Sequence, residues 1–208
     1  MIRYAITSRA LYPGDEQEKQ AAFLKEAFRW IHEGIEFVQL REKDLPAATV
    51  AALTRNLLHQ INLAASPTRL LINSRPDIAL ATGAHGVHLS SSPDALSPTQ
   101  VHKLYASTGR PLPLITIACH TQAEVLHARQ EKVDAILFAP VFEKPLTNDT
   151  KLPGQGLDQL RAACLAATPI PVYALGGVTD QNAPSCLEAG AAGVAGIRLF
   201  HHPRENTS

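Results

Sequence analysis

Two glycine-containing stretches late in the chain decide its predicted fold: Ala174-Leu175-Gly176-Gly177-Val178 and Gly193-Val194-Ala195-Gly196-Ile197-Arg198. Each combines a short apolar run typical of a buried strand with glycines suited to a tight turn. An open dinucleotide-binding sheet would place a GxGxxG turn after its first strand, where this chain has none. The late position of both turns therefore favours a closed barrel.

The rest of the chain alternates apolar runs with helix-like segments, the pattern of parallel strands joined by crossover helices. Segments 16–33, 47–62 and 121–131 have apolar residues at intervals of three and four, and 76–82 forms a short helix. We expect strands at 4–8, 37–40, 70–73, 86–89, 114–118, 135–139, 172–175 and 193–197. The predicted fold is an α/β (β/α)8 TIM barrel, a single domain over residues 1–208 with a frayed tail at 202–208.

The composition excludes several classes of partner. The 208 residues include 19 basic and 19 acidic side chains, so there is no excess positive charge for nucleic acid. Three scattered cysteines form no disulfide framework or zinc motif, and no run is long enough to cross a membrane. We expect a cytoplasmic protein with a small-molecule ligand and with no nucleic-acid or membrane partner. Whether it forms a homo-oligomer stays open.

The late glycine turns are the first candidate ligand site. Backbone amides exposed by Gly176, Gly177, Gly196 and Ile197 could hold a phosphate group without a basic side chain. The alternative is that these glycines only permit tight turns. Two such turns in adjacent units favour phosphate, and Arg198 would add a forked cationic donor unless it is a surface residue.

A second candidate site follows the second predicted strand, at Gln39-Leu40-Arg41-Glu42-Lys43. Alternation along the strand puts Gln39, Arg41 and Lys43 on one side, which in a barrel points inward at the top. Three polar groups there are costly unless a ligand meets them. The alternative is a solvated cluster whose charge Glu42 and Asp44 balance.

A third candidate, His120, follows the fifth predicted strand. A histidine at the carboxyl end of a barrel strand can titrate near neutral pH and serve as an acid or base. His59, His102 and His127 lie within predicted helices and are expected to be exposed or to pack. The neighbouring Cys119 is a weaker nucleophile candidate, because no base is oriented toward it.

The longest irregular segments, 90–98 and 142–156, follow the fourth and sixth predicted strands. Loops at the carboxyl ends of the strands build the active face of a barrel. We therefore expect segment 142–156, rich in Pro, Gly, Asn and Thr, to be a substrate lid.

Along nearly its whole length the chain resembles the thiamine phosphate synthase and thiazole tautomerase superfamily. The motifs occur in the same order and are specific when taken together. They are Tyr4-Ala5-Ile6-Thr7, Val38-Gln39-Leu40-Arg41-Glu42-Lys43, Leu71-Ile72-Asn73-Ser74-Arg75, Gly83-Ala84-His85-Gly86-Val87-His88-Leu89, Cys119-His120-Thr121, Phe138-Ala139-Pro140-Val141-Phe142, Ala174-Leu175-Gly176-Gly177-Val178 and Ala189-Gly190-Ala191-Ala192-Gly193-Val194-Ala195.

The resemblance implies a (β/α)8 barrel of thiamine biosynthesis. Its late glycine turns would hold a thiazole phosphate, and Lys144 and Gly156 would contribute to substrate binding. In a synthase, Gln39, Arg41, Lys43 and Asn73 would hold an aminopyrimidine diphosphate, whose pyrophosphate leaves with the help of Mg²⁺.

Several positions depart from the synthase pattern. Ser74 replaces an aspartate expected to bind magnesium, and the other metal aspartate is matched only by Asp94, apparently shifted by one position. The Thr-x-Thr-Lys phosphate loop is replaced by the stretch from Lys144 to Thr147, and Ala118 replaces a serine. These losses affect the diphosphate half of the site and leave the thiazole half, which resembles the tautomerase branch.

We therefore expect a thiazole tautomerase-like isomerase in which His120 shuttles a proton and no cofactor is required. The first alternative is an active Mg²⁺-dependent thiamine phosphate synthase, a transferase. The second is a noncatalytic thiazole or thiamin phosphate-binding regulatory protein. Outside the superfamily, another phosphosugar isomerase barrel stays open.

Overall fold

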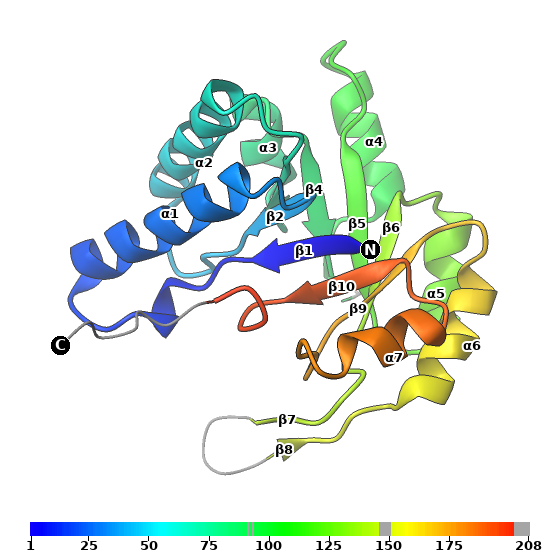
Figure 1. The fold of residues 1–208 in the computed structure, drawn as a ribbon. Helices are drawn as coiled ribbons and strands as arrows, with labels where there is room; N and C mark the ends of the chain where they lie inside the picture. Colours follow the sequence, from blue (N-terminus) through cyan, green and yellow to red (C-terminus); the bar gives the residue numbers. More distant parts are fainter. Residues whose placement is uncertain (91, 93, 146–150, 202–208) are drawn as a thin grey trace, which may run out of the picture.

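Eight parallel strands close into a barrel surrounded by helices in the computed structural model, which describes residues 1–90, 92, 94–145 and 151–201 (Figure 1). The strands neighbour one another in the order β1-β10-β9-β6-β5-β4-β3-β2. This arrangement confirms the predicted barrel class. The predicted tail at 202–208 lies outside the described residues.

All eight predicted strands are present, with ends shifted by at most two residues. β1 starts earlier than expected, because Ile2 pairs with Gly193 and the chain leaves the ladder with β10 before Thr7. The strands are β1 (Ile2–Ile6), β2 (Phe37–Leu40), β3 (Arg69–Asn73), β4 (Gly86–Leu89), β5 (Leu114–Cys119), β6 (Ala135–Phe138), β9 (Val172–Ala174) and β10 (Gly193–Gly196).

Local sequence explains where the helices begin and end. Asp15 and Glu18 form a capping box at the start of α1, and Gly83 ends α3 in the left-handed conformation. After β10 the described residues contain no further helix. The helices are η1 (Arg9–Leu11), α1 (Glu16–His32), α2 (Ala47–Leu63), α3 (Pro76–Thr82), α4 (Pro98–Ala106), α5 (Gln122–Gln130), α6 (Leu157–Ala167) and α7 (Ala183–Glu188).

Two hydrophobic layers hold the barrel together. The larger lies between strands and helices, and the smaller packs Tyr4, Ile6, Leu137 and Tyr173 together. The Tyr4 ring stacks on Phe37, with ring centroids 5.5 Å apart. This aromatic layer fills the barrel interior, so a ligand has room only above it, at one end of the strands.

The segment after β6 was predicted to be irregular, which is wrong in part. Within it, β7 (Lys144–Pro145) and β8 (Lys151–Leu152) form a two-stranded antiparallel pair that extends away from the barrel (Figure 1). This pairing satisfies backbone groups that an irregular loop would leave to water. Near the barrel the segment is anchored by hydrogen bonds from Val141 N to Leu175 O and from Phe142 N to Gly176 O, both 2.9 Å.

Candidate active site

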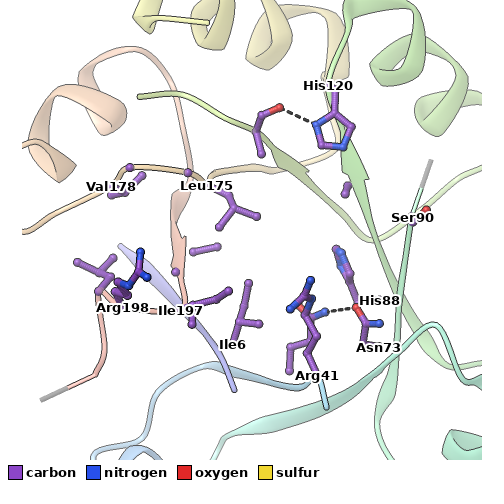
Figure 2. Close-up of a pocket in the computed structure, with 18 of the residues that line it drawn as sticks. Ile6, Arg41, Asn73, His88, Ser90, His120, Leu175, Val178, Ile197 and Arg198 are labelled. Carbon is purple, nitrogen blue, oxygen red and sulfur yellow. Dashed lines mark hydrogen bonds between the residues drawn. The ribbon is translucent and has the colours of Figure 1, made fainter. Parts of the chain in front are cut away.

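A cavity of about 620 Å³ lies at the carboxyl ends of the barrel strands. Loops after β2, β3, β4, β5, β6, β9 and β10 contribute to its wall, so residues far apart in the sequence meet there. In Figure 2, Val178, Ile197 and Arg198 lie on one side of it, and Asn73 and His88 lie on the other. The sequence-predicted residues that line it are Gln39, Arg41, Lys43, Asn73, His120, Gly176, Gly177, Gly196, Ile197 and Arg198.

The first wall of the cavity is the pair of glycine turns. No described residue accepts a hydrogen bond from the backbone N–H groups of Gly176, Gly177 or Val178. Asn182 supports this turn by donating from Nδ2 to Gly177 O over 3.0 Å. Unpaired consecutive amides at a cavity wall form a concave donor set suited to an anion.

The same glycines also have a packing role, so both interpretations made from the sequence have support. Gly176 and Gly177 have φ of +91° and +65°. A Cβ on Gly177 would lie 2.6 Å from the backbone oxygen of Glu143, and one on Gly176 would lie 2.7 Å from Pro140 Cα. Glycine therefore lets the segment after β6 approach the turn closely.

Arg198 lies beside the glycine turns, directly after β10. Its side chain is exposed, lines the cavity and has no ion-pair partner among the described residues. A guanidinium at this position can meet an anion that the amides of the turn hold.

The second wall is polar and is built from β2 and β3. Gln39 is buried and donates from Nε2 to Asn73 Oδ1 over 2.8 Å, while its own Oε1 has no partner. Arg41 and Lys43 follow on the same side of the chain, as alternation predicted. The geometry gathers two cations and a free amide oxygen at this end.

Glu42 and Asp44 do not balance these cations, contrary to the alternative considered from the sequence. Both carboxylates pair with Arg9, at 3.1 Å and 2.5 Å, and Arg9 also contacts Glu16. The hydrogen bond to Arg9 lowers the pKa of Asp44 to about 2. Local sequence could not show this, because Arg9 is more than 30 residues away. Arg41 and Lys43 therefore remain available to a ligand.

His120 lies at the top of β5 with one ring nitrogen occupied. Its Nδ1 is 2.7 Å from the carbonyl oxygen of Ala139, and a dashed line at His120 in Figure 2 marks this contact. The same oxygen accepts from Gln155 Nε2 over 2.9 Å, and the His120 backbone N–H donates to Glu124. These contacts hold the imidazole at the cavity wall, with Nε2 left for a ligand.

Cys119 is not a nucleophile in this structure. Its side chain belongs to the hydrophobic layer between strands and helices, and it does not line the cavity. Burial raises the pKa of the thiol to about 12, which keeps it protonated near neutral pH. His59 and His127 are exposed and His102 is half-buried, as expected for helix residues.

His88 is a cavity residue that the sequence analysis did not single out. It lies at the top of β4, almost fully buried, with Nδ1 2.9 Å from Thr116 Oγ1 on β5. Burial and, to a smaller extent, the charge of Arg41 lower its pKa to about 3. Alternation from His88 to Ser90, which directly follows the strand and also lines the cavity, is the pattern that could have revealed it.

The residues at the cavity do not suit Mg²⁺, the ion that the synthase resemblance implies. Ser74 and Ser90 line it where carboxylates would be needed, and Glu143 is the one acidic residue among its described lining. Asp94 is exposed and is not part of that lining. Among the described residues, no three His, Cys, Asp or Glu side chains could together hold a metal. Hard cations prefer several carboxylate oxygens, which this wall lacks.

Two of the predicted substrate-binding residues lie in or beside the segment after β6. Gly156 is absent from the described lining of the cavity and instead precedes α6 as its N-cap, with φ of +86°. Lys144 belongs to β7, and its side chain lies outside the described part of the structure. Its assignment as a substrate contact therefore stays a prediction.

Fold and site together define a barrel protein whose cavity, at the carboxyl ends of the strands, is lined by the glycine turns and by a histidine. The chain belongs to the thiamine monophosphate synthase (TMP-TENI) family, which residues 4–200 match. This places it in thiamine biosynthesis, as the resemblance implied. No helix among the described residues is long and apolar enough to cross a membrane.

Individual relatives are similar over most of the chain. A putative thiamine-phosphate synthase of Geobacter sulfurreducens is 43% identical over 162 residues, covering 78% of this chain and 71% of the relative. The putative thiamine-phosphate synthase 2 of Aquifex aeolicus is 34% identical, and the match covers 95% of this chain and 96% of the relative. The thiamine phosphate pyrophosphorylase structure from Pyrococcus furiosus has a TM-score of 0.76 at 24% identity. The match covers 95% of this chain and 85% of that structure, which supports the fold.

The names of these relatives favour the synthase alternative over the isomerase expected from the sequence. The described lining of the cavity contains Ser74 and Ser90 and one acidic residue, Glu143. The family is therefore established, and the reaction is a separate question.

Proposed function

We propose that this protein is a thiazole tautomerase-like isomerase that binds a thiazole phosphate and moves one proton on its ring without a metal ion. The observation that carries the proposal is the contact between His120 Nδ1 and the Ala139 carbonyl oxygen. A carbonyl oxygen only accepts, so Nδ1 carries the proton and neutral His120 presents a basic Nε2 to the cavity.

The phosphate group would lie at the glycine wall. The unpaired amides of Gly176, Gly177 and Val178 supply neutral donors, and Arg198 supplies a charged one. Binding the phosphate here fixes the ring between this wall and the histidine side of the cavity. Holding the reacting carbon near a base converts proton transfer into an intramolecular step.

The chemistry then needs one group that accepts and returns a proton. His120 Nε2 removes a proton from one ring carbon, and the resulting imidazolium delivers it to another ring position, which makes the ring aromatic. No bond to phosphorus changes and no charged group leaves. The absence of carboxylates suited to Mg²⁺ is compatible with this reaction, because no diphosphate departs.

The proposal is tested with the purified protein and the unaromatised thiazole phosphate. His120→Gln keeps a side chain of similar length but removes the base, and kcat should fall roughly 10²- to 10⁴-fold. His127 is exposed on α5, the helix that follows His120, so His127→Gln is the matched control and should leave kcat unchanged. Full isomerase activity in His120→Gln contradicts the proposal.

The second candidate, a thiamine phosphate synthase, is favoured by the names of the relatives and by the polar wall. Gln39, Arg41, Lys43 and Asn73 line the same cavity as the glycine turns, so a second heterocycle could lie beside the first. The two cations could offset part of the charge on a leaving diphosphate. Formation of thiamin phosphate from both heterocycle substrates with Mg²⁺ would support this candidate over the isomerase.

A further inference from the structure

The cavity contains two imidazoles on neighbouring strands, His88 of β4 and His120 directly after β5 (Figure 2). The ladder between these strands pairs His88 with Thr116, four residues before His120. At a rise of about 3.3 Å per residue, the two histidines are separated by roughly 13 Å along the strands. A heterocycle could therefore lie between them.

His88 belongs to a buried chain of three polar side chains. The hydroxyl of Tyr4 lies 3.1 Å from Thr116 Oγ1, and Thr116 Oγ1 lies 2.9 Å from His88 Nδ1. Tyr4 and Thr116 are at most 1% exposed, and the Tyr4 hydroxyl has no other hydrogen-bond partner among the described residues. The single hydroxyl proton of Thr116 can serve only one of its two neighbours.

The direction in which these two hydrogen bonds donate decides the tautomer of His88. If His88 Nδ1–H donated to Thr116 Oγ1, three protons would share two contacts, and the buried O–H of either Tyr4 or Thr116 would have no acceptor in this series. An unsatisfied buried donor costs about 1–3 kcal/mol. The opposite order, Tyr4 O–H to Thr116 and Thr116 O–H to His88 Nδ1, satisfies both hydroxyl protons. His88 then carries its own proton on Nε2.

The Nε2 atom of His88 opens onto the cavity. No described residue forms a hydrogen bond with it. It is also absent from the buried side-chain atoms that lack a hydrogen-bond partner, and His88 lines the cavity. Burial favours the neutral ring, and Arg41 adds a charge that opposes protonation. A neutral imidazole with Nε2–H is a hydrogen-bond donor that does not itself change charge.

We propose that His88 is a second substrate-contacting residue, a neutral donor whose Nε2–H bonds an acceptor atom of the bound ring while His120 Nε2 acts as the base. The two histidines thus hold opposite tautomers, Nε2–H in His88 and Nδ1–H in His120. Negative charge develops on the ring when its proton leaves, and a fixed donor stabilises that charge. His88 keeps its proton throughout. This inference rests on the proposed function for its chemistry.

The tautomers are measurable without any reaction. Long-range ¹H–¹⁵N correlation spectra of the ligand-free protein report which ring nitrogen of each histidine carries the proton, and spectra of His88→Gln and His120→Gln assign the two rings. We expect Nε2–H for His88 and Nδ1–H for His120 at neutral pH. A charged His88 or an Nδ1–H His88 overturns the inference, whatever reaction the protein catalyses.

Thr116 provides the variants that separate positioning from folding. Thr116→Ser keeps the hydroxyl and should leave His88 as Nε2–H, whereas Thr116→Val removes it and should produce a mixture of tautomers. A Thr116→Val protein with His88 still wholly in the Nε2–H form would show that the hydroxyl chain does not set the tautomer.

Kinetics with the unaromatised thiazole phosphate test the donor role itself. His88→Leu should lower kcat roughly 10²- to 10³-fold, as loss of a single charge-stabilising donor does, with a smaller change in KM. His88→Gln, which retains an N–H donor, should recover part of that loss. Unchanged kcat in His88→Leu overturns the donor role, while full activity in His120→Gln would instead contradict the proposed function.

Discussion

His120 Nδ1 lies 2.7 Å from the carbonyl oxygen of Ala139, and this contact determines what the cavity can do. It fixes the ring that follows β5 to the strand end of β6, and His120 Nε2 has no hydrogen-bond partner among the described residues. Gln155 shares the same acceptor, so the segment that returns from β8 also contributes to the position of the base.

The glycine turn should be intolerant of any side chain. In Gly177→Ala, the positive φ and the 2.6 Å approach to the Glu143 backbone oxygen both oppose folding. Gly109→Ala is the matched control, because Gly109 has φ of +67° but no atom within 4 Å of the added Cβ. We expect the control to lose about 1–2 kcal/mol in urea unfolding and Gly177→Ala to lose clearly more. Equal losses would mean that the close approach is not required.

The buried ion cluster around Arg9 should contribute to stability. Glu42 is buried and accepts from Thr7 Oγ1 over 2.7 Å as well as from Arg9. Glu42→Gln removes the one buried carboxylate among the three that pair with Arg9 and weakens charge-assisted hydrogen bonds, so we expect a loss of roughly 1.5–3 kcal/mol in urea unfolding. Asp158→Asn breaks the exposed pair with Arg161 and should change little. A Glu42→Gln protein as stable as Asp158→Asn would contradict this account.

His88 should make stability depend on pH. Its pKa is lowered to about 3 in the folded protein, whereas an unfolded histidine titrates near about 6.5. As pH falls below about 6.5, the unfolded chain binds a proton that the folded chain excludes, so stability is lost progressively toward pH 3. Between about pH 7 and pH 5, His88→Gln should therefore lose less stability than the wild type, as measured by urea midpoints.

His59, exposed on α2, is the control for that measurement. His59→Gln should follow the wild type across the same pH range. If His88→Gln also follows the wild type, His88 is not the group that excludes the proton.

The barrel could be predicted because its strands are continuous apolar runs. Phe37–Leu40 and Gly86–Leu89 were predicted with the same ends that the structure shows. In contrast, β7 and β8 pair only two residues each, which is too short to produce a periodic pattern.

The candidate site could be predicted where alternation and strand ends decide it. Gln39 of β2 lines the cavity, and Arg41 and Lys43 in the segment directly after the strand continue the same alternation. Partners distant in sequence could not be predicted in the same way. Arg9 pairs with Glu42, and His88 pairs with Thr116, through contacts that exist only after the barrel closes.

The most direct test of the central claim is to measure isomerisation of the unaromatised thiazole phosphate by the wild-type protein in excess chelator. The same preparation is assayed for thiamin phosphate formation from both heterocycle substrates with Mg²⁺. We predict rapid isomerisation that chelator does not affect, together with little or no coupling. Efficient Mg²⁺-dependent coupling with no isomerisation would contradict the account and assign the protein to the synthase reaction.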